Sequence, residues 1–349
     1  MILDDKVTQA MHRLEDLYHD TDGKCYISFS GGKDSTVLLV LAKMCAEIYT
    51  LPADGIKAVF VNTGIEMGIT VDFVKWVKEN YYPNLEIIRP EKSFDYCLKT
   101  YGKPMVSKIR SEYLGRFHKG NVSRSVMRNL ILGVTNQDKR ARRTVLADKY
   151  FHMVHPNFPI IASPMCCTFL KKKPFKKLVK EQDMKGSAYG LRMEEGGVRA
   201  LNIINRIGTG GKICTAVSKD GFIKKSPIVD WTDDDVEGFI KRYDVPLSKA
   251  YTEYGFTRTG CMACPYAKDV GHNLQYLHDY EPNRYKAIMH WLKDVYIAQN
   301  VILPFDLEYE RERAKMWREV YEPMRQEMLR IYRPNSTLIK EEEQLTLDF

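Results

Sequence analysis

Three observations predict an α/β fold built on a doubly wound, mainly parallel sheet. Short apolar runs at 25–29, 56–61 and 85–88 alternate with segments of helical periodicity. The first run passes into the following helix through a Gly-Gly turn, and the second ends in the turn signal Asn62-Thr63-Gly64. Alternating strands and helices with such connections favour a parallel sheet, whose ligands bind beyond the carboxyl ends of its strands.

The helices of this pattern follow from the spacing of apolar residues. An amphipathic helix is predicted over 5–19, and an apolar helix over 36–44 follows the Gly-Gly turn. Apolar residues at helical intervals mark a third helix around 71–77, and a further short strand is expected at 187–191. Thr232, with Asp235 three residues later, predicts a capped helix start.

Two regions break the alternation of strands and helices. Residues 103–160 are polar and basic with weak periodicity, so we interpret them as a basic insertion over the active-site face. After Cys264 the chain becomes helical and rich in aromatic residues, and its apolar stripes are typical of packing surfaces. We therefore expect a nucleotide-binding α/β domain over 1–265 and a helical extension with a polar tail over 266–349.

The composition is that of a soluble globular protein, with 349 residues, 44% hydrophobic and 28% charged. Lysine and arginine exceed aspartate and glutamate by 53 − 45 = 8, a modest balance compatible with a nucleotide or nucleic-acid ligand. No apolar run approaches the roughly 20 residues that span a bilayer, and the N-terminus lacks the features of a secretion signal. We expect a cytoplasmic protein with no membrane contact.

The stretch Ser30-Gly31-Gly32-Lys33-Asp34-Ser35 carries the strongest chemical signal. Glycines let a ligand approach the backbone, and the N–H groups and dipole of a helix start favour an anion. The stretch is not a Walker A loop, and a Gly-rich turn before an ordinary helix is the alternative interpretation. It resembles the PP-loop of the ATP pyrophosphatases and the sulfonucleotide reductases, which implies that it binds a pyrophosphate or a phosphosulfate.

Four of the eight cysteines form the second signal, because Cys166-Cys167 and the Cys261-x-x-Cys264 pair present two thiols each. The two pairs are separated by 261 − 167 − 1 = 93 residues, so only folding can bring them together. The pattern suits an iron–sulfur cluster or tetrahedral zinc equally well, and four unrelated thiols are the other interpretation. Cys25 and Cys45 fall within a predicted strand and helix, and we expect both in the core.

The order of the motifs makes a family resemblance specific. Cys166-Cys167 is followed by Gly190-Leu191-Arg192 with Arg199, then by Asp230-Trp231-Thr232, and then by the Cys261-x-x-Cys264 pair. This order resembles the phosphoadenosine/adenosine phosphosulfate reductase family, in its iron–sulfur branch. The resemblance implies an adenine nucleotide α-hydrolase-like fold and a [4Fe–4S] cluster on Cys166, Cys167, Cys261 and Cys264.

The same resemblance implies that Arg192 and Arg199 hold the phosphate or sulfate end of the nucleotide. Guanidinium groups are planar, always charged and bidentate towards phosphate, which agrees with that role. Two surface arginines are the alternative interpretation. The three lysines that follow the cysteine pair, at 171–173, would offset cluster charge, meet substrate anions or form a solvated basic face.

The chain departs from the family at its C-terminal end. A sulfonucleotide reductase attacks the sulfur of its substrate with a cysteine near the C-terminus, whereas residues 265–349 contain none. Cys97 and Cys214 remain as candidates for a relocated thiol, with a structural role as the alternative for each. Gly196 stands where the family has a serine, which changes the expected contact with the substrate.

The insertion concentrates positive charge. Its basic residues within 36 positions are Lys108, Arg110, Arg116, Lys119, Arg124, Arg128, Lys139, Arg140, Arg142 and Arg143. Such a segment either follows the phosphate backbone of a nucleic acid, with salt-dependent binding, or closes over a nucleotide.

The leading hypothesis is an iron–sulfur PP-loop enzyme that binds ATP, acts at the α-phosphate with release of pyrophosphate, and takes part in sulfur transfer onto an acceptor such as a nucleic acid. Related DNA phosphorothioation and RNA thiolation enzymes use a similar loop. The residues assigned to the nucleotide are Ser30, Gly31, Gly32, Lys33, Asp34, Ser35, Asn62, Thr63, Gly64 and Gly190. The catalytic candidates are Lys33, Asp34, Arg192 and Arg199, which face the reactive phosphates, where cations stabilise developing charge.

Further ligands and alternatives follow from this hypothesis. Mg²⁺ is expected with ATP, and Asp34 is a candidate ligand for it. A sulfur or electron donor protein is the other expected partner. One alternative is a sulfonucleotide reductase that uses a relocated cysteine on a phosphosulfate nucleotide. Another is a non-catalytic regulator that binds a nucleotide or a nucleic acid.

Overall fold

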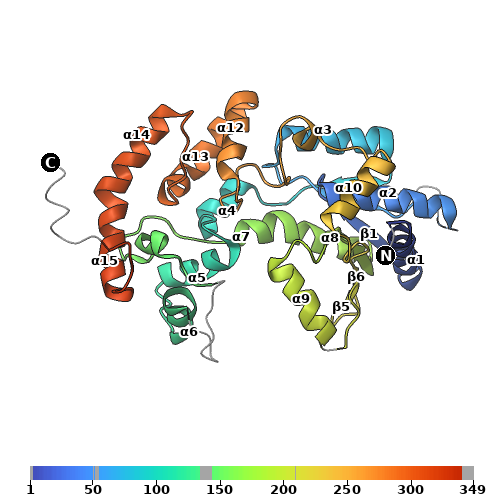
Figure 1. Cartoon of the computed structure of the whole chain (residues 1–349), viewed down its shortest axis with the longest axis horizontal. Coiled ribbons are helices and arrows are strands. Elements are labelled where there is room, and N and C mark those ends of the chain that lie inside the picture. The colour runs from blue at the N-terminus through green and yellow to red at the C-terminus, as the bar shows by residue number, and fades with distance from the viewer. Residues whose placement is uncertain (1–2, 50, 52–54, 134–143, 209, 340–349) are drawn as a thin grey trace. The chain divides into compact units, whose positions relative to one another are not determined.

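A computed structural model describes residues 3–49, 51, 55–133, 144–208 and 210–339 (Figure 1), without the side chains of 197–199 and 202. The chain forms two compact units, one of residues 1–91 with 170–261 and one of residues 92–169 with 262–349. Within the described chain, no helix is long and apolar enough to cross a membrane.

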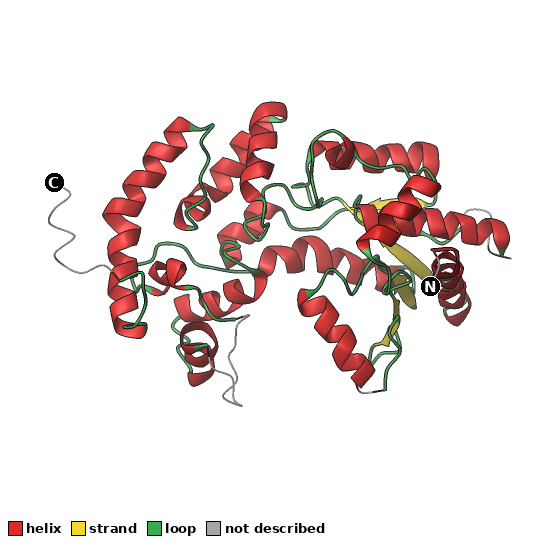
Figure 2. Cartoon of the chain, viewed as in Figure 1, coloured by secondary structure: helices red, strands yellow, loops and turns green. Residues whose placement is uncertain are grey.

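The first unit contains a six-stranded sheet in the order β3-β2-β1-β4-β6-β5. The strands are β1 (Cys25–Phe29), β2 (Ala58–Val61), β3 (Leu85–Ile88), β4 (Gly186–Ala188), β5 (Thr215–Val217) and β6 (Ile223–Lys225). All neighbouring strands are parallel except β5, which pairs antiparallel with β6. The expected mainly parallel sheet is confirmed, and its strands are drawn in yellow in Figure 2.

Helices cover both faces of this sheet. The helices of this unit are α1 (Leu3–Asp20), α2 (Lys33–Ile48), α3 (Gly68–Trp76) with its π-helical continuation (Val77–Tyr81), α8 (Lys173–Glu181), α9 (Gly197–Gly208), α10 (Asp233–Arg242) and α11 (Lys249–Thr252). Successive side chains of a strand point to opposite faces. Accordingly Ile27 and Phe29 pack with α1 and α2 in the main core, whereas Tyr26 packs with Phe175 and Leu178 of α8 on the other face.

The elements predicted from the sequence occur close to their expected positions. Helix α2 begins at Lys33 rather than at residue 36, because Gly32 takes the extended backbone of a helix cap. The strand expected at 187–191 is β4, which ends at Ala188. The capping box of Thr232 and Asp235 at the start of α10 is confirmed. The short strands β5 and β6 were not predicted, because three residues carry too little periodicity.

The second unit is helical. Its elements are α4 (Phe94–Tyr101), α5 (Lys108–His118), α6 (Arg124–Val126) with a π-helical turn (Met127–Leu132), a 3-10 segment (Asp148–Val154), α7 (Met165–Cys167), α12 (Val270–Tyr280), α13 (Pro282–Ala298), α14 (Leu307–Met316) with a π-helical turn (Trp317–Tyr321), and α15 (Glu322–Tyr332). A further π-helical turn (Thr168–Lys172) connects α7 to α8.

The segment expected to be a polar insertion contributes to the core of this second unit. Phe151, Met153 and Val154 are buried, and α15 packs against the 3-10 segment that carries them. His152 is fully buried among the rings of Trp317 and Tyr321, and its Nε2 lies 2.8 Å from the Ala298 carbonyl oxygen. Burial lowers the pKa of His152 to about 3, so the ring is a neutral part of the core.

Candidate functional site

The predicted anion-binding loop connects β1 to α2 at the carboxyl edge of the sheet. Gly31 has a φ of +73°, and a Cβ on it would lie 3.1 Å from Thr70 Cγ2, so glycine is required there. The two serines of the loop fold it. Ser35 Oγ accepts from the Ser30 N–H at 3.2 Å and donates to the Gly32 carbonyl oxygen at 2.8 Å. The loop is thus held as a compact turn at the start of the helix.

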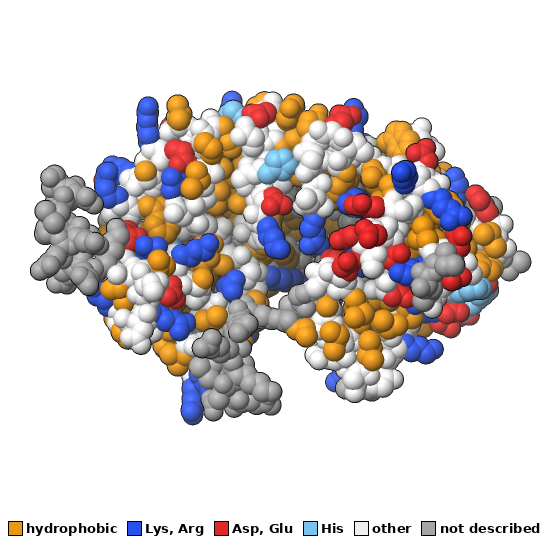
Figure 3. Space-filling view, in the orientation of Figure 1, with side chains coloured by type: hydrophobic (Ala, Val, Ile, Leu, Met, Phe, Trp, Pro, Cys, Tyr) orange, Lys and Arg blue, Asp and Glu red, His pale blue; other side chains and the backbone are white. Residues whose placement is uncertain are grey.

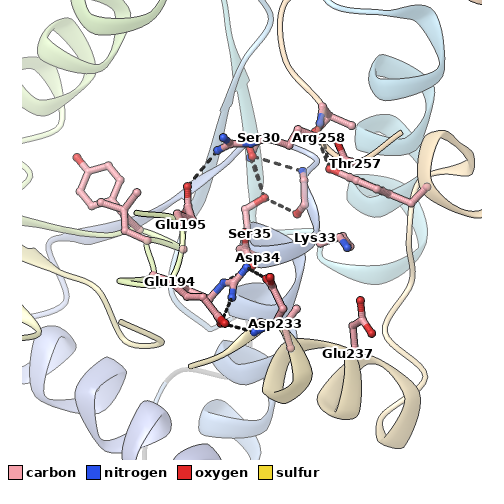
Figure 4. Close-up of a pocket in the computed structure, with 18 of the residues that line it drawn as sticks. Ser30, Lys33, Asp34, Ser35, Glu194, Glu195, Asp233, Glu237, Thr257 and Arg258 are labelled. Carbon is pink, nitrogen blue, oxygen red and sulfur yellow. Dashed lines mark hydrogen bonds and ion pairs between the residues drawn. The ribbon is translucent and has the colours of Figure 1, made fainter. Parts of the chain in front are cut away.

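The loop opens into a pocket of about 600 Å³ whose described lining residues all belong to the first unit. Figure 4 shows Glu194, Glu195 and Asp233 gathered around Asp34 and Ser35. The lining residues are Ser28, Ser30, Gly32, Lys33, Asp34, Ser35, Tyr189, Gly190, Leu191, Arg192, Glu194, Glu195, Asp233, Val236, Glu237, Tyr251, Thr257, Arg258 and Thr259. Three of them are Lys or Arg and five are Asp or Glu, a balance of 3 − 5 = −2. The space-filling view shows acidic side chains gathered near the start of α10 (Figure 3).

Arg192 lies at the centre of the charged residues and is 6% exposed. Its Nε donates to Asp34 Oδ1 at 2.9 Å, and its Nη2 donates to Asp233 Oδ1 at 2.6 Å. Its Nη1 lies 3.5 Å from Glu194 Oε2 and, within the described chain, is a buried donor without a hydrogen-bond partner. The ion pair with Glu194 offsets part of the cost of burying a donor that makes no hydrogen bond.

Burial raises the pKa of the Asp34 carboxyl, and pairing with Arg192 offsets only part of this effect. The charge of Glu195 adds to the rise. The folded protein therefore holds Asp34 in an environment that disfavours its own negative charge. Carboxylates held against such a cost are typical of functional sites.

Tyr251 and Thr259 close the pocket over the start of α2. The Tyr251 hydroxyl accepts from the Thr259 N–H at 3.1 Å, and Lys33 Nζ lies 5.7 Å from the centre of the Tyr251 ring. Burial raises the pKa of Tyr251, so it is a neutral phenol at the loop. Gly190 lies against the loop from the other side, since a Cβ on it would be 2.9 Å from the Asp34 carbonyl.

The Asp230-Trp231-Thr232 motif positions the pocket wall rather than lining the pocket. Both carboxylate oxygens of Asp230 accept from the buried Arg13 guanidinium, at 2.8 and 2.9 Å, and so hold α1 to the start of α10. Trp231 is buried against Phe239. The Asp233 N–H then donates to Glu194 Oε2 at 2.5 Å, which connects α10 to the segment that carries Arg192.

Three groups of predicted ligand contacts lie away from the pocket or outside the described residues. Asn62, Thr63 and Gly64 follow β2 at the same sheet edge but are not among the lining residues, and Thr63 Oγ1 donates to the buried Glu66 at 2.8 Å. Arg199 lies in α9, and its side chain is outside the described part of the structure. The basic residues Lys139, Arg140, Arg142 and Arg143 also lie outside the described residues.

Three of the four candidate ligand cysteines, Cys166, Cys167 and Cys264, belong to the second unit, as does Tyr266. Burial raises the pKa of Tyr266, and the negative charges of Cys166, Cys167 and Cys264 add to that rise. Cys261 ends the first unit, where its backbone forms a β-bridge with Glu66. In the described ranges, no group of three or more His, Cys, Asp or Glu residues has the arrangement of a metal site.

The other cysteines are placed as small buried or half-buried side chains. Cys25 and Cys45 are in the core, and burial raises their pKa values to about 11 and about 12. Cys97 is fully buried in α4, and Cys214 is half-buried beside Thr215. No cysteine is among the described residues that line the pocket.

Several pocket residues were not predicted as site residues: Glu194, Glu195, Asp233, Glu237, Tyr251, Thr257, Arg258 and Thr259. The sequence held a signal for some of them. Glu194 and Glu195 follow Arg192 within three residues, and residues 257–259 lie just before the Cys261-x-x-Cys264 pair. Tyr251 and Glu237 lie on helices where neither spacing nor residue type distinguishes them from surface residues.

A parallel sheet with a Gly-Gly loop opening a pocket at its carboxyl edge defines the chain as an α/β protein of the PP-loop class. The sequence profile of the phosphoadenosine phosphosulfate reductase domain matches residues 24–119 and 121–267. Because the match extends over well more than half of the 349 residues, the chain belongs to this family.

The chain is similar in sequence to two longer proteins of one archaeon. Two uncharacterized proteins of Methanocaldococcus jannaschii are each 25% identical, over 244 and 279 residues, which are 69% and 77% of this chain. The matches cover 41% and 42% of those proteins, so the chain spans about two fifths of the length of the curated relatives it matches.

Among solved structures, the phosphoadenylyl-sulfate reductase of Candida auris is 17% identical, with coverage of 68% of this chain and 81% of that one and a TM-score of 0.38. The U34-tRNA thiolase NcsA of Methanococcus maripaludis, with its [4Fe-4S] cluster, is 15% identical, with coverage of 90% and 80% and a TM-score of 0.36. Yeast FAD synthetase is 13% identical, with coverage of 92% and 86% and a TM-score of 0.40.

Proposed function

We propose that this protein is an iron–sulfur PP-loop enzyme that binds ATP in the pocket and acts at its α-phosphate, with release of pyrophosphate, in sulfur transfer onto a nucleic acid. The observation that carries the proposal is the combination, in one pocket, of the folded Ser30–Ser35 loop, the start of α2 and a set of paired cations and carboxylates. A helix start with exposed N–H groups binds phosphate.

The acidic balance of the pocket favours ATP with Mg²⁺ over a phosphosulfate nucleotide. Five carboxylates against three cations would repel a bare triphosphate. Carboxylate oxygens are ligands that suit Mg²⁺, so Asp34, Asp233 and Glu237 fit a cation that arrives with the nucleotide. Mg²⁺ would neutralise phosphate charge and orient the leaving pyrophosphate.

The remaining roles follow from the donors in the pocket. Ser30, Ser35 and the Gly32 and Lys33 N–H groups would hold the pyrophosphate end, and the Lys33 ammonium would stabilise the charge that develops on it. Arg192 is held by Asp34 and Asp233 in one orientation beside the loop, where its positive charge would stabilise phosphate charge. Arg199 is assigned to the same phosphates through the family motif.

The proposed reaction balances without electron transfer. An oxygen of the acceptor bonds to the α-phosphorus, the bond from that phosphorus to the bridging oxygen of the β-phosphate breaks, and pyrophosphate leaves. Hydrosulfide from a donor then displaces AMP from the acceptor. The acceptor oxygen leaves on AMP, and sulfur takes its place.

The four candidate cysteines offer the thiol ligands that an iron–sulfur cluster requires. Cys166 and Cys167 are adjacent in α7, Cys261 and Cys264 form a Cys-x-x-Cys pair, and soft thiolates are the ligands that iron–sulfur clusters take. Cys261 is the assigned fourth ligand. An iron–sulfur cluster bound there would supply an iron centre suited to holding sulfur.

A direct test is to purify the full chain without oxygen, denature it, and identify the bound metal, sulfide and nucleotide. The proposal predicts iron with acid-labile sulfide, an adenine nucleotide, and pyrophosphate release from ATP in the presence of nucleic acid. Asp34→Asn should abolish the release, with Asp220→Asn as the control, because Asp220 is an exposed aspartate outside the pocket. Zinc without sulfide would overturn the cluster, and absence of both ATP binding and pyrophosphate release would overturn the reaction.

The sulfonucleotide reductase alternative has less support, since no cysteine is among the described lining residues of the pocket. It predicts sulfite release from adenosine phosphosulfate with thioredoxin, and loss of that release in Cys97→Ser or Cys214→Ser. Sulfite at background level would remove it.

A further inference from the structure

We propose that a stripe of lysines along α8 and at its N-cap binds the phosphate backbone of a single-stranded nucleic acid and directs it towards the pocket of the first unit. The stripe consists of Lys172, Lys176 and Lys180, and Lys173 and Lys177 flank it. The inference rests on the proposed function, in which the sulfur acceptor is a nucleic acid. It assigns the contact to α8, whereas the sequence had pointed to the basic segment at 103–160.

The spacing of these lysines places them on one side of the helix. Positions 172, 176 and 180 follow each other at intervals of four residues, so they form a row about 12 Å long. All three are exposed, as are Lys173 and Lys177. The other side of α8 carries Phe175, Leu178 and Val179, which pack onto the sheet. The helix therefore turns a continuous basic face to solvent.

The stripe lacks the ion pairs that neighbouring lysines have. Lys177 pairs with Glu91 at 2.8 Å, and Lys171 lies 3.8 Å from Glu66. In the sheet against which α8 packs, Lys57, just before β2, pairs with Glu86 of β3 at 3.2 Å. Within the described ranges, Lys172, Lys176 and Lys180 have no acidic partner. Their charge is available to a ligand.

The arrangement is unfavourable for the helix itself. The first turn of α8 carries no acidic residue, and lysines stand at the end where the helix dipole is already positive. Like charges four residues apart also repel each other. A local arrangement that opposes stability without a structural gain is typical of a functional surface.

The order and direction of the elements place one end of the stripe at the sheet edge where the pocket lies. Helix α8 precedes β4, which is parallel to β1, so α8 runs opposite to the strands and starts at their carboxyl edge. The Ser30–Ser35 loop lies at the same edge. The pairing of Lys171 with Glu66, which follows β2, agrees with this placement. A strand bound along the stripe would reach the edge where the nucleotide binds.

The chemistry of the face favours a nucleic acid over a membrane surface. A helix that lies in a membrane interface needs exposed apolar side chains. The apolar residues of α8 are instead packed onto the sheet. A linear row of unpaired ammonium groups matches a polymer with regularly spaced phosphates.

The experiment measures binding of the full chain to fluorescein-labelled single-stranded RNA and DNA by anisotropy, between about 50 and 200 mM salt. The stripe variant is Lys172→Gln/Lys176→Gln/Lys180→Gln. The control is Lys78→Gln/Lys219→Gln/Lys241→Gln, three exposed lysines of the same unit that remove equal charge. Three lost phosphate contacts should lower the log–log salt slope by about 2, so the wild type loses about twentyfold more affinity than the stripe variant over this range.

The control variant should keep the wild-type slope. Equal slopes for the stripe and control variants, or no binding of either nucleic acid, would overturn the proposal. Stripe-dependent binding to phosphatidylserine vesicles without stripe-dependent binding to nucleic acid would overturn it as well. ATP binding by the stripe variant, measured separately, distinguishes a failure of this proposal from a failure of the proposed function, because Lys172, Lys176 and Lys180 do not line the pocket.

Discussion

Replacing Gly190 with alanine perturbs the pocket at a backbone contact. The added Cβ would lie 2.9 Å from both the carbonyl carbon and the carbonyl oxygen of Asp34, and 3.1 Å from the Asp34 Cβ. Contacts this short against backbone are not relieved by a side-chain rotation. Either the first turn of α2 or the segment that carries Arg192 must move, which separates the Asp34 and Arg192 side chains that now meet at 2.9 Å.

The size of the effect follows from these contacts. Overpacking of this kind costs about 1–3 kcal/mol of folding free energy, and each kcal/mol lowers Tm by about 2–4 °C in domains of 150–250 residues. Loss of a charge-assisted hydrogen bond costs about 1.5–3 kcal/mol. In the proposed function Asp34 and Arg192 both face the nucleotide, so their displacement should also weaken ATP binding; we expect a loss of about tenfold, which corresponds to about 1.4 kcal/mol of binding free energy.

The assay is calorimetric titration of ATP with Mg²⁺, together with thermal unfolding of the same preparations. The control is Gly208→Ala in α9 of the same unit, where a Cβ meets no atom within 4 Å. We expect the control to match the wild type in both measurements. Wild-type ATP affinity and Tm in Gly190→Ala would refute the assignment of this close approach to the nucleotide pocket.

Three further predictions concern charge and hydrogen bonding. Because the pKa of Asp34 is raised in the folded state, its ionisation destabilises the fold as pH rises above its unfolded value of 3.8. Asp34→Asn should therefore unfold at the wild-type Tm or higher at pH 7, lose that advantage at acid pH, and show no pyrophosphate release; a lower Tm at pH 7 contradicts this. Tyr296→Phe removes the hydroxyl that donates to the Ala263 carbonyl at 2.5 Å, where Ala263 has a φ of +44° between the two cysteines of the Cys261-x-x-Cys264 pair. It should speed loss of iron to a chelator by about threefold to tenfold, whereas Tyr321→Phe should not; equal rates argue against this positioning role. Lys172→Glu, at the N-cap of α8, should raise the free energy of unfolding by about 0.3–1 kcal/mol while weakening nucleic-acid binding, and a loss of stability in denaturant titration would contradict it.

The sheet and its loop could be predicted because their signals are local. Gly31 and Gly32 lie between an apolar strand and an apolar helix, and the two serines that fold the loop are within six residues of each other. The Thr232 capping box is local for the same reason. The Arg192 pairing with Asp34 and Asp233 spans 158 and 41 residues, and only the family motif pointed to that arginine.

The core of the second unit and the position of Tyr251 could not be predicted, because both depend on tertiary packing between residues far apart in the sequence. Residues 103–160 were predicted to be an insertion, because the segment as a whole is polar and basic with weak periodicity. The core around His152 also needs the rings of Trp317 and Tyr321, which come more than 150 residues later in the chain. Tyr251 reaches the loop from a helix of four residues, too short to show any periodicity.

In the proposed function, the pocket carries out a reaction at the α-phosphate of ATP. The most direct measurement is the identity and ratio of the products formed when anaerobically purified protein is incubated with ATP, Mg²⁺, sulfide and nucleic acid. The account predicts AMP and pyrophosphate in equal amounts, with both absent in Asp34→Asn. Formation of ADP and inorganic phosphate, or no turnover by protein that holds its cluster and binds ATP, would contradict it.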